Sequence, residues 1–196
     1  DARRVMGDPL HSKPVVVTYG GTTAAPDLTI FFTTNDGYLH AIDADDGSEV
    51  FSFIPPETMI NANDLYENLG SLGHKIYGLD GAITPWVKDS DKDGIIEPAA
   101  GDFVRIVFGQ RRGGNNYWAL DVTDRANPVY MWKITGGAGD FTEMGQTWSD
   151  PVLGKVKVGT TLTDVIVFGG GYDTDQDDNT TYADDERVRD AIRAGA

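Results

Sequence analysis

The sequence contains no cysteine, no long apolar run and few basic residues. Without cysteine, a disulfide scaffold and a thiolate zinc site are excluded. A membrane-spanning helix needs about 18 apolar residues in a row, and no apolar stretch of the sequence is that long, so we expect no membrane span. Only 16 basic side chains stand against 31 acidic ones, giving a net charge of -15. We expect no nucleic-acid partner, because phosphates require a basic patch.

Signatures of catalysis are also missing. No Gly-x-Ser-x-Gly elbow occurs, and His11, His40 and His74 lack the HExxH spacing of a zinc protease. We therefore expect these histidines to be packing or surface residues and the protein not to be an enzyme. The run Arg111-Arg112-Gly113-Gly114 lacks the Gly-Lys-Ser/Thr that follows in a phosphate-binding loop, and we interpret it as a hairpin turn. The four tryptophans are interpreted as packing residues between sheets.

Three short phrases recur in the same order, which indicates an internal repeat. A first strand follows a hydroxyl residue and a proline, and a second strand is rich in β-branched and aromatic residues. In two copies, Ala-apolar-Asp ends a third strand, and a fourth strand follows a turn. The predicted strands lie at 12–17, 28–34, 41–43 and 49–54; at 84–87, 103–109, 119–121 and 129–134; and at 149–153 and 164–169. Four antiparallel strands per repeat predict an all-β fold made of β-propeller blades.

About two and a half blades are present, whereas a closed propeller has four to eight. The remaining blades must therefore come from a longer parent protein or from a partner. The chain starts at Asp1 without an initiator methionine, so we expect a fragment. Copies are spaced by roughly 70 residues, more than the 40 to 50 of a blade, so loops must be inserted. We assign 1–182 to a partial propeller domain, with a short helix and loop within 57–81, and leave the charged tail 183–196 unassigned.

One inserted loop, at 89–97, has the alternating carboxylates of a calcium site. Gly94 at position 6 permits the sharp turn, and the following carbonyl can act as a ligand. The predicted Ca²⁺ ligands are Asp89, Asp91, Asp93, the Ile95 carbonyl and Glu97. Ala100 stands where a helix-loop-helix site has its closing glutamate, so the loop is a shorter one closed by Glu97. The alternative is a solvated acidic hairpin turn, since Asp and Gly favour turns for their own reasons.

A second stretch, 173–184, repeats the alternate carboxylates. Its position 6 is Asp178 rather than glycine, and position 12 is Asp184. A second calcium site and an acidic loop at the edge of a blade both remain open for this stretch.

Several phrases together resemble known propellers. Ala41, Asp43, Gly47 and Phe51 match the alanine-aspartate-glycine-tryptophan docking phrase of quinoprotein-type blades, with Phe51 in place of the usual tryptophan. The longer strings are HSKPVV at 11–16, NDGYLHA at 35–41, QRRGGNNYWALDVTD at 110–124 and GGGYD at 169–173. With these, the chain from about Gly7 to Asp178 resembles the C-terminal propeller of the PilY family of type IV pilus biogenesis and tip-adhesin proteins. The resemblance implies a nine-residue calcium loop, and 89–97 falls on its pattern.

The resemblance also implies a function. We expect a calcium-binding propeller on the bacterial surface, at the pilus tip or outer membrane, with pilus subunits or minor pilins as partners. In such a protein, calcium occupancy is expected to regulate pilus extension against retraction and hence twitching motility. A loop of like charges that orders on binding an ion is a suitable switch. Alternatives are a quinoprotein-type dehydrogenase, disfavoured by the missing cysteine pair, and a scaffold for outer-membrane assembly.

Overall fold

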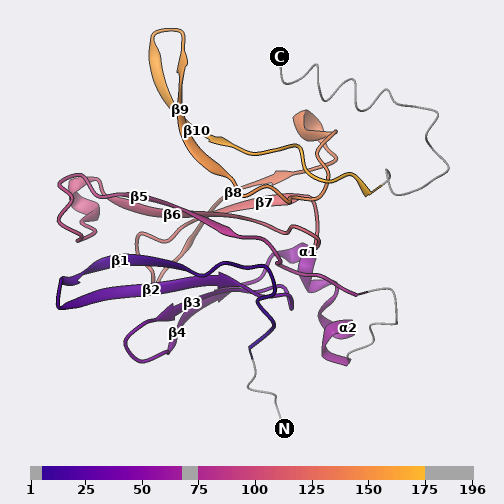
Figure 1. Cartoon of the computed structure of the whole chain (residues 1–196), viewed down its shortest axis with the longest axis horizontal. Helices are drawn as coiled ribbons and strands as arrows, with labels where there is room; N and C mark the ends of the chain where they lie inside the picture. Colours follow the sequence, from indigo (N-terminus) through magenta and orange to yellow (C-terminus); the bar gives the residue numbers. More distant parts are fainter. Residues whose placement is uncertain (1–5, 68–74, 175–196) are drawn as a thin grey trace.

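The computed structural model describes residues 6–67 and 75–174, which form two four-stranded sheets and one β-hairpin (Figure 1). The first sheet contains β1 (Val15–Thr22), β2 (Ala25–Thr33), β3 (Leu39–Asp43) and β4 (Glu49–Phe53). The second contains β5 (Ile83–Lys88), β6 (Phe103–Gly109), β7 (Asn116–Asp121) and β8 (Val129–Thr135). The hairpin pairs β9 (Val152–Val158) with β10 (Thr161–Val167). In each sheet, neighbouring strands are consecutive in the chain and antiparallel, as predicted for propeller-like blades.

The two sheets share an irregularity at the same place in the repeat. The pairing of β3 with β4 shifts register between Ala41 and Ile42, and that of β7 with β8 shifts between Ala119 and Leu120. In both sheets the extra residue lies on the fourth strand, Val50 of β4 and Met131 of β8, opposite the Ala-apolar step of the recurring phrase. A bulge bends its strand and increases the local twist. The fourth strand of each complete sheet therefore bends at the same place in the repeat.

Small differences from the predicted strand limits have local causes. The fourth strand of the first sheet ends at Phe53, one residue early, before a pair of prolines that cannot donate to a ladder. β10 begins at Thr161, three residues earlier than predicted, because Gly159 at φ +62° makes the turn immediately after β9. The interpretation of 111–114 as a turn between the second and third strands is confirmed.

The core lies between the two complete sheets. Phe31 of β2 and Phe108 of β6 are both fully buried, and Phe53 of β4 packs its ring edge against Phe108 with centroids 6.1 Å apart. Phe53 also meets Trp118 of β7 at 6.0 Å, so the predicted packing role of this tryptophan is confirmed. Burying such aromatic area is the main favourable contribution to folding. The alternation along these strands thus selects one inner face shared by both sheets.

Hydrogen bonds also connect successive units. Thr33 Oγ1 at the end of β2 donates to the carbonyl of Gly81, 2.7 Å away, just before β5. Thr84 Oγ1 in β5 donates to the carbonyl of Pro151, also at 2.7 Å, just before β9. Each unit is therefore attached to the lead-in of the next one. β1 and β5, the first strands of the two complete sheets, lie next to each other, whereas the β9–β10 hairpin projects away from them (Figure 1).

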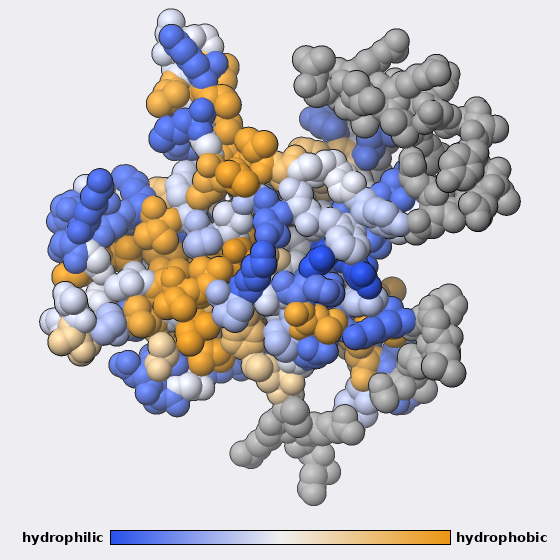
Figure 2. Space-filling model, in the orientation of Figure 1, coloured by the Kyte–Doolittle hydropathy of each residue, from blue (hydrophilic) through white to orange (hydrophobic). Residues whose placement is uncertain are grey.

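The hairpin differs from the sheets in its exposure. Figure 2 shows hydrophobic residues on it, at the top of the view. Within the described residues, β9 and β10 pair only with each other. The exposed apolar side chains of the hairpin are Val152, Val156, Val158, Leu162 and Val167. A strand edge and face of this kind normally pack against further chain.

Within 6–67 and 75–174, helical structure is confined to short connections. The expected helix in the 57–81 insertion is present as α1 (Pro56–Met59) and α2 (Ala62–Glu67), and single 3-10 turns occupy Pro98–Ala100 and Gly139–Phe141. His40 stacks on Phe32 with ring centroids 5.2 Å apart, which confirms a packing role. His74, the tail 183–196 and nearly all of 173–184 lie outside the described residues. Across the described ranges, no helix is long and apolar enough to cross a bilayer.

Candidate metal centre

The acidic loop connects β5 to β6 at one end of the second sheet. The two strands pair without interruption from Ile83 with Phe108 to Lys88 with Phe103, so residues 89–102 form a loop outside the ladder. The loop and its 3-10 turn project beyond the strands in Figure 1. The first nine residues of this loop are the predicted calcium site.

Three of the predicted ligands come together. The carboxylates of Asp89, Asp91 and Asp93 each place an oxygen within 4.8 Å of the other two. Oxygens bound to one Ca²⁺ at 2.3 to 2.6 Å can be separated by at most about 5 Å, so this spacing is compatible with one shared ion. Asp89 is half-buried, whereas Asp91 and Asp93 face solvent. The arrangement fits an oxygen-rich site at the surface.

Backbone N–H groups hold these carboxylates in place. Asp89 accepts from Lys92 N–H at 2.7 Å with one oxygen and from Gly94 N–H at 2.9 Å with the other. Asp93 accepts from Ile95 N–H at 2.8 Å. Gly94 has φ +84°, a value that few other residues adopt without strain. Since each carboxylate oxygen has further lone pairs, these bonds leave the oxygens able to bind a cation.

The surroundings of Asp91 in the acidic loop disfavour its ionised form. Loss of solvation, followed by the negative charge of Asp93, raises the pKa of Asp91 above its usual value. Like charges close to each other disfavour the ionised forms. A bound dication would reverse this effect, because it stabilises the ionised carboxylates.

Asp102, a residue that the sequence analysis did not single out, closes the loop. Its buried carboxylate accepts from Ser90 N–H at 3.0 Å and from Glu97 N–H at 3.3 Å, so it joins both ends of the nine-residue stretch. Hydrogen bonding by Ser90 lowers the pKa of Asp102. The only signal in the sequence is an aspartate directly before the second strand of the blade.

The other two predicted ligands have different surroundings. The carboxylate of Glu97 is not in the group of mutually close carboxylates found among the described residues. The backbone of Glu97 is engaged, since its carbonyl accepts from Ala100 N–H at 2.9 Å. Ile95 is partly exposed, while Ile96 packs against the core. The structure thus brings together three of the four predicted carboxylate ligands, all of them aspartates.

A further contact ties the loop to the first sheet. Ile96 N–H donates to the carbonyl of Tyr19 in β1 at 3.1 Å. Tyr19 in turn donates its hydroxyl to the carbonyl of Val122 at 2.8 Å, and burial raises the pKa of this phenol. Arg125 stacks on the Tyr19 ring at 5.0 Å and pairs with Asp27 of β2. The acidic loop is therefore attached to the boundary between the two sheets.

Successive four-stranded antiparallel sheets, with an acidic loop inserted in one, define a propeller-like protein with a candidate cation site. No family model matches the chain. A type IV pilus biogenesis factor PilY1 homolog from Xylella fastidiosa is 30% identical over 193 residues, covering 88% of this chain and 15% of the relative. PilY1 from Pseudomonas aeruginosa strain PAO1 is 30% identical over 150 residues, covering 76% of this chain and 12% of the relative.

A solved structure agrees with these relatives. The crystal structure of the Pseudomonas aeruginosa PilY1 C-terminal domain superimposes with a TM-score of 0.51 at 28% identity. The match covers 77% of this chain and 26% of that one. The chain belongs to the PilY family, as the sequence phrases indicated. It spans about a seventh of the length of the Xylella relative.

Proposed function

We propose that this chain is a calcium-binding, non-enzymatic part of a type IV pilus biogenesis factor. The proposed ligands are Asp89, Asp91, Asp93, Glu97 and the Ile95 carbonyl. The convergence of three aspartates within 4.8 Å is the observation that supports the site. Calcium is favoured over magnesium, because magnesium prefers few protein carboxylates and retains several waters.

The proposal extends to the whole propeller. We assign residues 1–182 to about two and a half quinoprotein-like blades, with the remaining blades supplied by a longer parent protein. The curated relatives are named as type IV pilus biogenesis factors, and the chain matches 15% or less of their length. Pilus subunits or minor pilins are the proposed partners, at the pilus tip or the outer surface of the cell.

Calcium is proposed to regulate the balance between pilus extension and retraction. Its binding would relieve the repulsion among the aspartates, and the loop is connected through Ile96 to Tyr19 in the other sheet. A change in the loop can therefore alter the contact between two blades. Such a local electrostatic event acting on a packed boundary is a common form of switch.

Calorimetric titration tests the site. Ca²⁺ should bind at micromolar strength, with Mg²⁺ much weaker. Asp91→Ala should weaken Ca²⁺ by at least about tenfold, equivalent to about 1.4 kcal/mol. The matched control is Asp45→Ala, which removes an exposed aspartate from the Asp-rich turn between β3 and β4. Equal affinity for both metals, or equal losses in both variants, would show that the loop is only an acidic turn.

Motility of cells carrying the intact parent protein tests the regulation. Asp91→Ala removes a ligand and should behave as calcium-free. Asp91→Lys places an ammonium near Asp89 and Asp93 and should mimic the neutralised, occupied loop. The two variants should change twitching and pilus number in opposite directions. If both lose calcium and pili are unchanged, the ion is structural and the regulatory proposal is wrong.

A further inference from the structure

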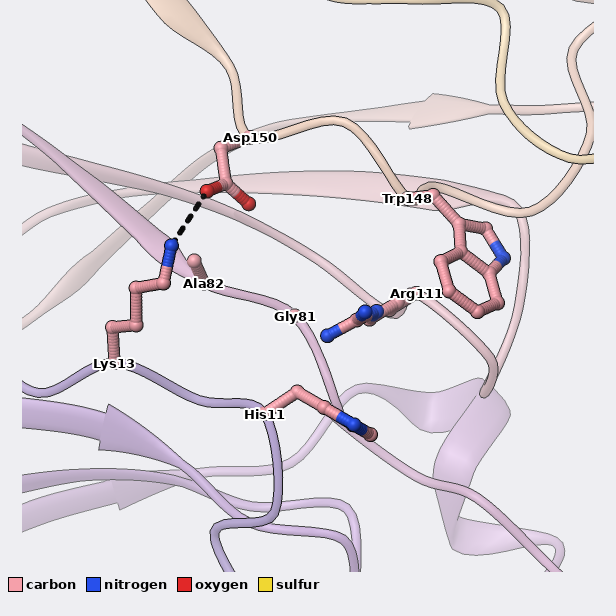
Figure 3. Close-up of a pocket in the computed structure, with 7 residues that line it drawn as sticks. All are labelled: His11, Lys13, Gly81, Ala82, Arg111, Trp148 and Asp150. Carbon is pink, nitrogen blue, oxygen red and sulfur yellow. Dashed lines mark hydrogen bonds and ion pairs between the residues drawn. The ribbon is translucent and has the colours of Figure 1, made fainter.

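A cleft of about 240 Å³ lies where the three units meet, at the opposite ends of β5 and β6 from the acidic loop. We call it the hub cleft and define it by Lys13, Arg111, Trp148 and Asp150, with His11, Gly81 and Ala82 completing its walls. Its walls come from the segments that lead into β1, β5 and β9, and from the turn after β6 (Figure 3). Drug-sized ligands usually occupy about 300 to 1,000 Å³. The hub cleft is therefore suited to a small group or a single side chain.

The hub cleft is cationic although the whole chain carries a net charge of -15. His11 is engaged by the buried carboxylate of Asp80, 2.9 Å from its Nδ1, which leaves Lys13, Arg111 and Asp150 as the other charged groups that line the cleft. Lys13 and Arg111 then face a single carboxylate, Asp150. The lining thus has an excess of one positive charge, which matches one negative charge on a ligand.

The pair between Lys13 and Asp150 is weak. Their charged atoms are 3.5 Å apart, and the side chains are 77% and 55% exposed. Exposed pairs of this kind contribute about 0 to 1 kcal/mol. Lys13 can therefore turn to another anion at little cost.

Arg111 is held more firmly and points into the hub cleft (Figure 3). Its backbone has φ +50°, unusual for a residue other than glycine, and its N–H donates to Thr147 Oγ1 at 2.9 Å. The guanidinium lies 4.6 Å from the ring centroid of Trp148. Its Nε is buried and has no hydrogen-bond acceptor among the described residues. A buried donor without a partner is costly and often indicates a missing ligand or solvent group.

The ring of Trp148 contacts a second cationic side chain, Arg112. The guanidinium of Arg112 lies 5.1 Å from the same ring, and the indole N–H donates to Gln146 at 3.0 Å, which fixes the ring. Two like charges against one ring repel each other unless an anion is near. A planar guanidinium fixed by an aromatic ring is well suited to bidentate recognition of a carboxylate.

We propose that the hub cleft binds a carboxylate, held by the guanidinium of Arg111 and by Lys13. A singly charged carboxylate matches the excess of one positive charge better than a phosphate dianion, which would leave a net negative charge beside Asp150. Its source is either a small free acid or an acidic side chain of a partner peptide. Both present the same group to Arg111.

The test is a titration of the 196-residue chain followed by the amide NMR signals of Gly81 and Ala82, which line the hub cleft. Sodium acetate should shift both signals to saturation, whereas sodium chloride at equal ionic strength should not. Arg111→Gln should weaken acetate by at least tenfold. The matched control, Arg112→Gln, removes the neighbouring cation from the same ring but does not line the hub cleft, and should change binding less than twofold. Should Arg111→Gln fail to fold, Arg111→Lys is the second variant. It keeps the positive charge but lacks the two parallel N–H donors of the guanidinium, so it should still weaken acetate binding severalfold.

The source is decided by the blocked peptide acetyl-Gly-Glu-Gly-amide and its glutamine counterpart. Tighter binding of the glutamate peptide than of acetate supports a peptide side chain, whereas equal or weaker binding supports a free acid. No saturable shift with acetate, or equal weakening by the two arginine variants, overturns the proposal. Tighter binding of inorganic phosphate than of acetate overturns the carboxylate assignment.

Discussion

One of the three units joins its first and second strands differently from the other two. β1 and β2 are connected by residues 23–24, and β9 and β10 by 159–160, whereas β5 and β6 are connected by the long acidic loop 89–102. Nevertheless β5 pairs with β6 in as regular a register as β9 with β10. A two-residue turn is thus sufficient to pair these strands. The acidic loop is therefore not needed to pair β5 with β6.

The acidic loop and the strands that it connects also differ in burial. The strands that the acidic loop connects include fully buried residues such as Val104 and Ile106, whereas its aspartates lie half-buried or exposed. We therefore expect the stability of the fold to reside in the sheets, and the affinity for a cation to reside in the loop. Variants that affect one property without the other test this separation.

The largest loss of stability should come from the core. Phe108→Ala removes a fully buried ring that packs on Phe53, and should lower the free energy of unfolding by about 3 to 5 kcal/mol. Val156→Ala on the exposed hairpin should cost less than about 0.5 kcal/mol. Urea denaturation of both variants measures the difference. Similar losses would mean that β9 and β10 are packed as tightly as the central sheets.

A pair of turn glycines separates backbone strain from metal binding. Gly94 in the acidic loop and Gly159 in the β9–β10 turn have φ of +84° and +62°, with open space around an added Cβ. Alanine at either should cost about 1 to 2 kcal/mol from conformation alone. Gly94→Ala should also weaken Ca²⁺ in calorimetry, whereas Gly159→Ala should leave it unchanged. Unchanged calcium affinity in Gly94→Ala would argue against a site built on this turn.

Two aspartates of the acidic loop should respond oppositely to loss of charge. The pKa of Asp102 is lowered by hydrogen bonding from Ser90, so its stabilisation is present at neutral pH and is lost as the pH falls through the lowered pKa. Asp102→Asn should therefore lower the melting temperature at pH 7 in EDTA, and the difference from wild type should vanish in acid.

Asp91 has a raised pKa, so its ionised form opposes folding once the pH exceeds the ordinary value. Asp91→Asn should therefore raise the melting temperature slightly at pH 7 in EDTA, with no effect in acid. Added calcium should reverse the order, because the wild type then gains a ligand that the variant binds less well. A lower melting temperature than wild type for both Asp102→Asn and Asp91→Asn at pH 7 in EDTA would contradict the opposite roles of the two aspartates.

The repeat in the sequence predicts much of the fold, because strand patterns and turn residues act locally. The Ala-apolar-Asp phrases ending at Asp43 and Asp121 mark the ends of β3 and β7, and the loop 89–97 lies between strands as expected. The proximity of the carboxylates of Asp89, Asp91 and Asp93 also follows from their alternate positions in the sequence.

Contacts between distant segments could not be predicted in this way. Asp102 acts on the loop only after the chain has folded back, and Ile96 meets Tyr19 from another sheet. Likewise, Arg111 and Trp148 lie in different units, and only the packing of three lead-in segments brings them to one cleft. Such sites depend on tertiary arrangement, which a single sequence shows only through its repeats.

The smallest effect is expected on the hairpin surface. Lys155 of β9 pairs with Asp164 of β10 directly opposite, with side chains 59% and 45% exposed. An exposed cross-strand pair contributes about 0.2 to 1 kcal/mol, so Lys155→Ala should change stability by less than about 1 kcal/mol and leave calcium binding unchanged. Arg125→Met, which breaks the pair with Asp27 and the stacking on Tyr19 at the sheet boundary, should cost more. Urea denaturation with and without calcium compares them. If only Arg125→Met also shifts the effect of calcium on stability, the boundary between the sheets is coupled to the acidic loop; if neither does, the loop binds its ion independently of that boundary.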